Sequence, residues 1–109
     1  MTDLEICKRI AEIEGEFTKC KDWSVNMCAQ LEFGDGANWK EYNPLKDKAL
    51  CFDLIEMWVE ELGIDIHRAY KEHTCTYAVD TGFSVIFNGS LAKAACLARI
   101  EINKRGDRI

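Results

Sequence analysis

The sequence predicts an α+β domain in which helices pack on the faces of an antiparallel sheet of about three to five strands, an α/β/α-type sandwich. Three observations indicate this fold class. Apolar residues repeat at helical spacing in some segments, they alternate with polar residues in others, and clusters of turn residues separate the two kinds. A chain of 109 residues can bury one hydrophobic core, so we expect a single domain over residues 1–109.

The most clearly patterned helix is predicted over residues 45–62. Asn43 and Pro44 precede it and provide a capping residue and a fixed backbone angle, and Gly63 follows it as a left-handed stop. We expect its wide apolar stripe to cover one face of the sheet. The stripe consists of Leu50, Cys51, Leu54, Ile55, Trp58, Val59 and Leu62.

Two further helices are predicted near the ends of the chain. Thr2 and Glu5 form a capping box at the start of a helix over residues 3–14. Ser90 caps the other, over residues 91–103, whose alanine-rich face indicates close packing against a sheet.

Strands are predicted where apolar and polar residues alternate or where β-branched and aromatic residues cluster. The polar residues 16–22 are interpreted as a connection. The predicted strands cover residues 24–33, 38–42, 64–70, 74–79 and 83–87.

The composition narrows the classes of function. The net charge is −5, which argues against direct binding of nucleic acid because phosphates require a basic face. The charged N-terminal segment and the lack of a long apolar run lead us to expect a cytoplasmic protein that does not enter membranes. The six cysteines are then expected to be reduced. Cys7, Cys51 and Cys96 lie on apolar helical stripes as small hydrophobic residues.

A metal site is the first chemical interpretation of the cysteines and histidines. Cys20, Cys28, His73 and Cys75 together offer four soft ligands. Their spacing is not that of structural zinc sites, which usually pair ligands two to four residues apart. Scattered reduced thiols are the favoured interpretation, so we expect no metal and no cofactor.

Catalysis is the second interpretation. Cys75 could act as a nucleophile with His67 or His73, but the chain has neither a nucleophile elbow nor a glycine loop for phosphate. We interpret the paired carboxylates as part of a solvated helix face. A catalytic pair requires one carboxyl group in a desolvated pocket that raises its pKa. We therefore expect a protein that is not an enzyme. The carboxylate pairs are Asp53 with Glu56 and Glu60 with Glu61.

Binding to a protein is the third interpretation. Trp23, Trp39 and Tyr42 surround a turn at residues 34–38, where they either form a protein-binding hot spot or close one end of the core. Acidic residues opposite the apolar stripe of residues 45–62 are either a plain solvated face or a negative strip for a basic partner. The candidate partner-binding residues are Trp39, Tyr42, Asp53, Glu56 and Glu60.

Three segments carry a resemblance to a known family. MTDLEICKRIAEIEG, YNPLKDKALCFDL and LAKAACLARIEINK, in that order, resemble small proteins of phages and prophages, the phage ABA-sandwich family. The chain departs from the family pattern at Lys46 and Lys48, at the Ser90 start of the last segment, and at Arg99 and Glu101.

The resemblance implies helices on both faces of a sheet and brings no activity and no catalytic residues. It implies a phage accessory protein that acts in the host cytoplasm by binding a host protein or protein complex. The most specific version is inhibition of a nucleic-acid defence complex, as an anti-CRISPR protein does. A metal-binding module and a self-assembling module, including a homo-oligomer, are the alternatives.

Overall fold

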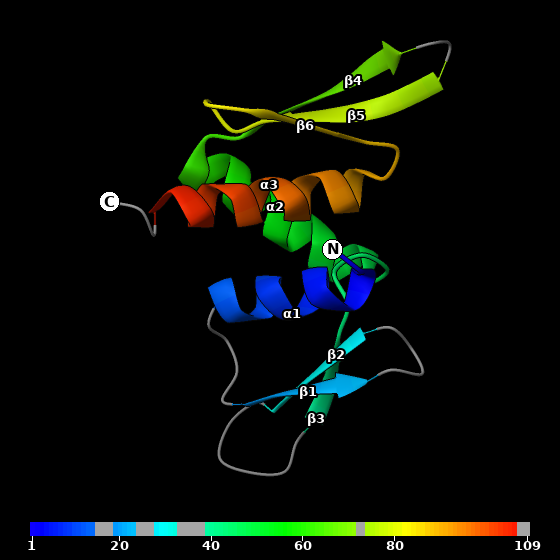
Figure 1. Ribbon diagram of the computed structural model, residues 1–109, viewed down its shortest axis with the longest axis vertical. Helices are drawn as coiled ribbons and strands as arrows, with labels where there is room; N and C mark the ends of the chain where they lie inside the picture. The colour runs from blue at the N-terminus through cyan, green and yellow to red at the C-terminus, as the bar shows by residue number, and fades with distance from the viewer. Residues whose placement is uncertain (15–18, 24–27, 33–38, 72–73, 107–109) are drawn as a thin grey trace.

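Helices lie between two antiparallel sheets in this protein, as the computed structural model shows (Figure 1). The structure describes residues 1–14, 19–23, 28–32, 39–71 and 74–106, and the side chains of residues 1–14, 41–70 and 76–106. The helices of the described part are α1 (Asp3–Glu14), α2 (Lys48–Leu62) and α3 (Leu91–Gly106). Helix α1 packs on β1 and β2 and on α3, and α3 packs on β5 and β6.

The strands of the described part form two groups of three. The N-terminal sheet has the order β1-β2-β3 and the C-terminal sheet has the order β4-β5-β6, with every neighbouring pair antiparallel. In the N-terminal sheet the strands are β1 (Lys19–Trp23), β2 (Cys28–Glu32) and β3 (Trp39–Tyr42). In the C-terminal sheet they are β4 (Asp65–Lys71), β5 (Thr74–Asp80) and β6 (Val85–Asn88).

The expected α+β class is confirmed, as is the packing of helices on antiparallel sheet structure. The layer order differs from the expected sandwich, because the strands divide into two sheets with the helices between them. Each sheet pairs strands that are consecutive in the chain, and α2 separates the two sets. Strand β1 lies where a connection was expected. Its polar sequence lacks an alternating pattern, and it is a strand because it pairs with β2.

Three of the predicted capping residues form the expected hydrogen bonds at the helix ends. Glu5 N–H donates to Thr2 Oγ1 at 3.2 Å, and Lys93 N–H donates to Ser90 Oγ at 3.3 Å, as the capping residues predict. Gly63 ends α2 with φ of 68° and donates its N–H to the Val59 carbonyl, also as predicted.

Helix α2 starts later in the chain than the sequence predicts. The helix begins at Lys48 rather than residue 45, and its cap is Asp47, whose carboxylate accepts the Leu50 N–H at 3.2 Å. Asn43 was expected to act as the cap. Its carbonyl instead accepts the N–H groups of Lys46 at 3.1 Å and Asp47 at 2.8 Å, which closes the turn before the helix.

The small residues of α3 explain its central position. Ala94, Ala95, Ala98 and Cys96 are buried, so that α3 can approach α1 and the C-terminal sheet closely. Helix α2 packs on α3, whereas we expected it to cover a sheet. As a result, only part of the predicted stripe of α2 is buried, at Leu54 and Trp58.

One carboxylate joins the three helices. Glu14, in the last turn of α1, accepts a hydrogen bond from Trp58 Nε1 of α2 at 2.8 Å. The same oxygen, Oε1, accepts a hydrogen bond from Arg99 Nε of α3 at 3.2 Å. The Glu14 side chain is 11% exposed and Arg99 is 17% exposed, so water replaces neither contact easily. At the other end of α1, Lys93 Nζ lies 2.8 Å from Asp3 Oδ1.

Replacing Glu14 should therefore destabilise the helical layer. We expect Glu14→Ala to lower the free energy of unfolding by about 2 to 3 kcal/mol, because it leaves the buried Trp58 N–H and the Arg99 guanidinium without their acceptor. Urea unfolding would measure this loss. The control is Glu12→Ala, which removes an exposed ion pair to Arg9 and should cost about 0.5 kcal/mol. Equal losses for the two variants would contradict the role of Glu14.

Candidate functional site

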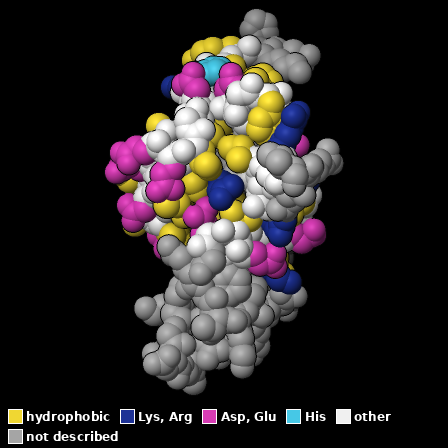
Figure 2. Space-filling model, turned by 90° about the vertical axis from the view of Figure 1, so that its left-hand side faces the viewer, with side chains coloured by type: hydrophobic (Ala, Val, Ile, Leu, Met, Phe, Trp, Pro, Cys, Tyr) yellow, Lys and Arg dark blue, Asp and Glu magenta, His cyan; other side chains and the backbone are white. Residues whose placement is uncertain are grey.

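The outward side of α2 carries the acidic candidates. Asp53, Glu56 and Glu60 are exposed, and their i, i+3, i+7 spacing places them along one side of the helix. We call these three residues the acidic strip. Figure 2 shows acidic side chains gathered on one side of the helical layer. The carboxylates lie in solvent, which agrees with the interpretation that they are not a desolvated catalytic pair.

An apolar surface runs beside the acidic strip. Phe52 is 64% exposed and Val59 is 42% exposed, and Ile55 between them is half-buried. Their i, i+3, i+7 spacing places them on an adjacent side of α2. We call these three residues the apolar shoulder. An exposed aromatic ring next to a row of charges is typical of a protein-binding surface, in which apolar contacts lie beside a polar rim.

The aromatic candidates have different outcomes. Tyr42 is only 5% exposed and belongs to the hydrophobic core. It therefore does not fit the role of a surface anchor, since β3 turns its ring inward. Trp39 lies in β3 and Trp23 in β1, and their side chains are outside the described part of the structure.

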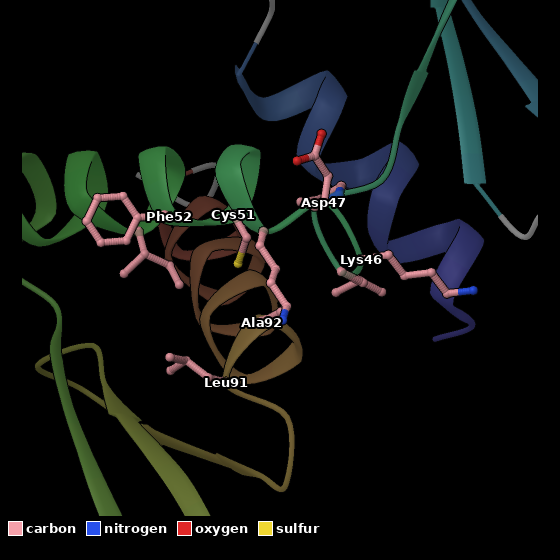
Figure 3. A pocket seen from close by; sticks show the side chains of 10 residues that line it. Lys46, Asp47, Cys51, Phe52, Leu91 and Ala92 are labelled. Carbon is pink, nitrogen blue, oxygen red and sulfur yellow. The ribbon is translucent and has the colours of Figure 1, made fainter.

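A pocket of about 380 Å³ opens between the first turns of α2 and α3. In Figure 3, Cys51 points from α2 towards the start of α3, where Leu91 and Ala92 lie. Phe52 flanks the pocket, while the side chains of Lys46 and Asp47 are directed away from Cys51. The pocket is thus an apolar hollow that continues the apolar shoulder. We did not predict it from the sequence. The available signal was Phe52, a large apolar residue outside the buried stripe.

The surroundings of Cys51 and Cys96 disfavour the thiolate form of each side chain. Burial raises the pKa of Cys51, and the negative charge of Asp47 raises it further. Burial likewise raises the pKa of Cys96, and Cys51 and Cys7 add to this shift. Cys7 and Cys96 are buried and Cys51 is half-buried, which confirms the prediction that these three residues pack on apolar helical stripes.

The proposed metal ligands lie outside what the structure describes. This holds for His73 and for the side chains of Cys20, Cys28 and Cys75. Among the described residues, no three His, Cys, Asp or Glu side chains are grouped so as to hold a metal ion. His67, a candidate base, is exposed on β4.

None of the described helices has the length and apolar character needed to cross a membrane.

Comparison with known proteins returned no relative. No protein-family model matches the chain, and no curated protein and no solved structure is significantly similar to it.

The reactivity of Cys51 provides a test of its surroundings. Asp47→Asn removes the negative charge that raises the thiol pKa but keeps a good helix cap. A lower pKa gives more thiolate at a given pH, so alkylation of Cys51 by iodoacetamide at pH 8 should become faster. The rate should stay below that of a fully exposed thiol, because burial is the larger cause of the shift.

Mass spectrometry of the digested protein would assign the alkylated residue. The control is Asp53→Asn, which removes an acidic charge that does not contribute to the Cys51 shift. An unchanged rate in Asp47→Asn, or an equal increase in Asp53→Asn, would contradict the assignment.

Proposed function

We propose that this chain is a protein-binding accessory protein that acts without catalysis, and that α2 provides its contact surface. The observation that carries the proposal is the adjacency of the acidic strip to the exposed apolar shoulder on one helix. A stable interface needs an apolar centre and a polar rim, and both are present here. The acidic strip favours a partner with a basic surface, since complementary charge speeds association and excludes other partners.

The finer version of this proposal comes from the resemblance to phage ABA-sandwich proteins. On that basis the partner is a host protein or protein complex in the host cytoplasm, and the first candidate is a nucleic-acid defence complex that the chain inhibits in the manner of an anti-CRISPR protein. Such complexes carry basic surfaces for nucleic acid, which an acidic strip can occupy. We expect the chain itself not to bind nucleic acid, because its net charge is −5.

Charge reversal on α2 tests the contact surface. The triple variant Asp53→Lys, Glu56→Lys, Glu60→Lys should reduce capture of the partner from host lysate by about tenfold or more at low salt, because attraction becomes repulsion. Raising the salt concentration should weaken capture by the wild-type protein as well. In host cells that carry the defence complex, expression of the wild-type chain should restore infection and expression of the triple variant should not.

The matched control reverses three exposed acidic residues elsewhere, in the variant Glu12→Lys, Glu41→Lys, Asp65→Lys. It changes the net charge by the same amount and should retain capture. Equal loss of capture in both triple variants would show that the net charge, and not the position of the acidic residues, determines binding. Capture that persists in the α2 variant would contradict the proposed surface.

A second candidate function, self-assembly, is favoured by the outer face of the C-terminal sheet. Val79 and Ile86 pair across β5 and β6 and face the core, so the alternate residues Val85 and Phe87 face outward. Phe87 is 58% exposed, and its partner Ala78 is buried. Two copies of the chain could bury this apolar row against each other.

Sedimentation velocity over a range of concentrations would test self-assembly. If this face pairs two copies, the wild-type protein should form a dimer and Phe87→Lys should be a monomer. The control is Tyr70→Lys, which changes an exposed aromatic residue on the opposite face of the same sheet and should leave the dimer intact. A wild-type protein that stays monomeric throughout would remove this alternative.

A further inference from the structure

The pocket between α2 and α3 has the character of an anchor site. Its walls include Cys51, Ile55, Leu91 and Ala92, and Phe52 stands at its edge. The polar group nearest the helix start, the Asp47 carboxylate, is already engaged as the cap of α2 and points away from Cys51. A volume of about 380 Å³ is enough for one large apolar side chain. Water in such a hollow has few polar partners, so its replacement by an apolar group is favourable.

The charges around the pocket are arranged in order along α2. Lys46 and Lys48 line the pocket at the start of the helix, and the acidic residues follow towards its end. With a rise of about 1.5 Å per residue, Glu56 lies about 6 Å and Glu60 about 12 Å along the axis from Phe52. These offsets are about one and two helical turns. A second helix that inserts a side chain into the pocket can therefore place Lys or Arg one and two turns away, opposite the acidic residues.

The apolar pocket followed by acidic residues along α2 favours one kind of ligand. A helix laid along a groove uses one apolar anchor followed by residues at turn spacing, which is the pattern that α2 and the pocket complement. An acidic helix laid along α2 would be repelled by the acidic strip. A basic amphipathic helix matches both the hollow and the charge beside it.

We propose that the pocket between α2 and α3 holds a large apolar side chain of a basic amphipathic helix that lies along the acidic strip. The inference rests on the proposed protein-binding function and specifies its partner. The apolar side chain provides most of the affinity, because anchors in desolvated pockets dominate interfaces. The basic residues set the direction of the helix, with its positive end over Glu56 and Glu60 rather than over Lys46 and Lys48.

The test uses two fluorescein-labelled synthetic helical peptides. Both carry Lys one and two turns after the anchor position, and they differ in having Trp or Ala at that position. Fluorescence anisotropy should show that the Trp peptide binds the wild-type protein about tenfold more tightly than the Ala peptide. A saturating concentration of the Trp peptide should also slow alkylation of Cys51 by iodoacetamide, since the anchor covers the thiol.

Variants then locate the anchor. Ala92→Trp fills the pocket from α3 and should reduce the affinity for the Trp peptide to that for the Ala peptide, without changing the latter. The unchanged affinity for the Ala peptide also shows that the variant is folded. The matched control, Ala49→Trp, adds the same side chain at an exposed position of α2 outside the pocket and should leave the difference between the peptides intact.

Three results would overturn the inference: failure of both peptides to bind, equal affinity of the two peptides, or Cys51 alkylation at the same rate with and without bound peptide. These results do not depend on the lysate experiment. If charge reversal on α2 abolishes capture from lysate while the peptides fail, the proposed function stands and only the anchor is wrong. If the capture is insensitive to charge reversal, the proposed function itself fails.

Discussion

The arrangement of this protein depends on the carboxylate of Glu14. It accepts hydrogen bonds from Trp58 and Arg99, and so it connects α1 to residues 44 and 85 positions further along the chain. The Trp58 ring is 1% exposed, which means that its N–H requires a partner inside the protein. Apolar burial alone would allow the helices to slide or rotate, because it has no direction. The shared carboxylate fixes how far each helix is turned about its axis.

That orientation decides which side of α2 reaches solvent. Because Trp58 is drawn towards Glu14, Leu54 faces inward with it, and Phe52 and Val59 are left outside. Helix α3 meanwhile covers the inner face of the C-terminal sheet, so α2 does not need to cover a sheet. The apolar shoulder, the acidic strip and the pocket are thus products of the same packing. Glu14 itself is nearly buried, yet its hydrogen bonds help to determine which side of α2 is exposed.

Local signals in the sequence predicted elements better than they predicted their assembly. The capping box at Thr2, the serine at position 90 and the left-handed Gly63 are all used as expected, since each acts within one helical turn. The start of α2 was misplaced because Asn43 and Asp47 are both capping residues, and only the preceding turn determines which of them caps the helix. Strand β1 was missed because it depends on pairing with β2.

The features of the candidate site were likewise predicted only where they depend on local sequence. Exposure of Asp53, Glu56 and Glu60 follows from helical periodicity, so the sequence predicted it. The burial of Tyr42 and the pocket at Cys51 depend on which helices and strands become neighbours. The spacing of apolar residues along the sequence does not contain this information. A stripe as wide as that of α2 also contains more apolar residues than one contact face can bury. The excess residues, such as Val59, mark a surface that is available to another molecule.

The sequence separation of 85 residues between Glu14 and Arg99 also affects the order in which contacts can form during synthesis. The ribosome produces α1 first and α3 after both sheets, so the side of α1 that faces α3 must wait for nearly the whole chain. Each sheet, by contrast, pairs strands that are neighbours in the chain, so its strand contacts are local. The face of α1 that packs on α3 therefore stays uncovered until α3 has been synthesised. Helix α3 contacts α1, α2, β5 and β6, so the packing of all three helices and of the C-terminal sheet is completed only when α3 is present.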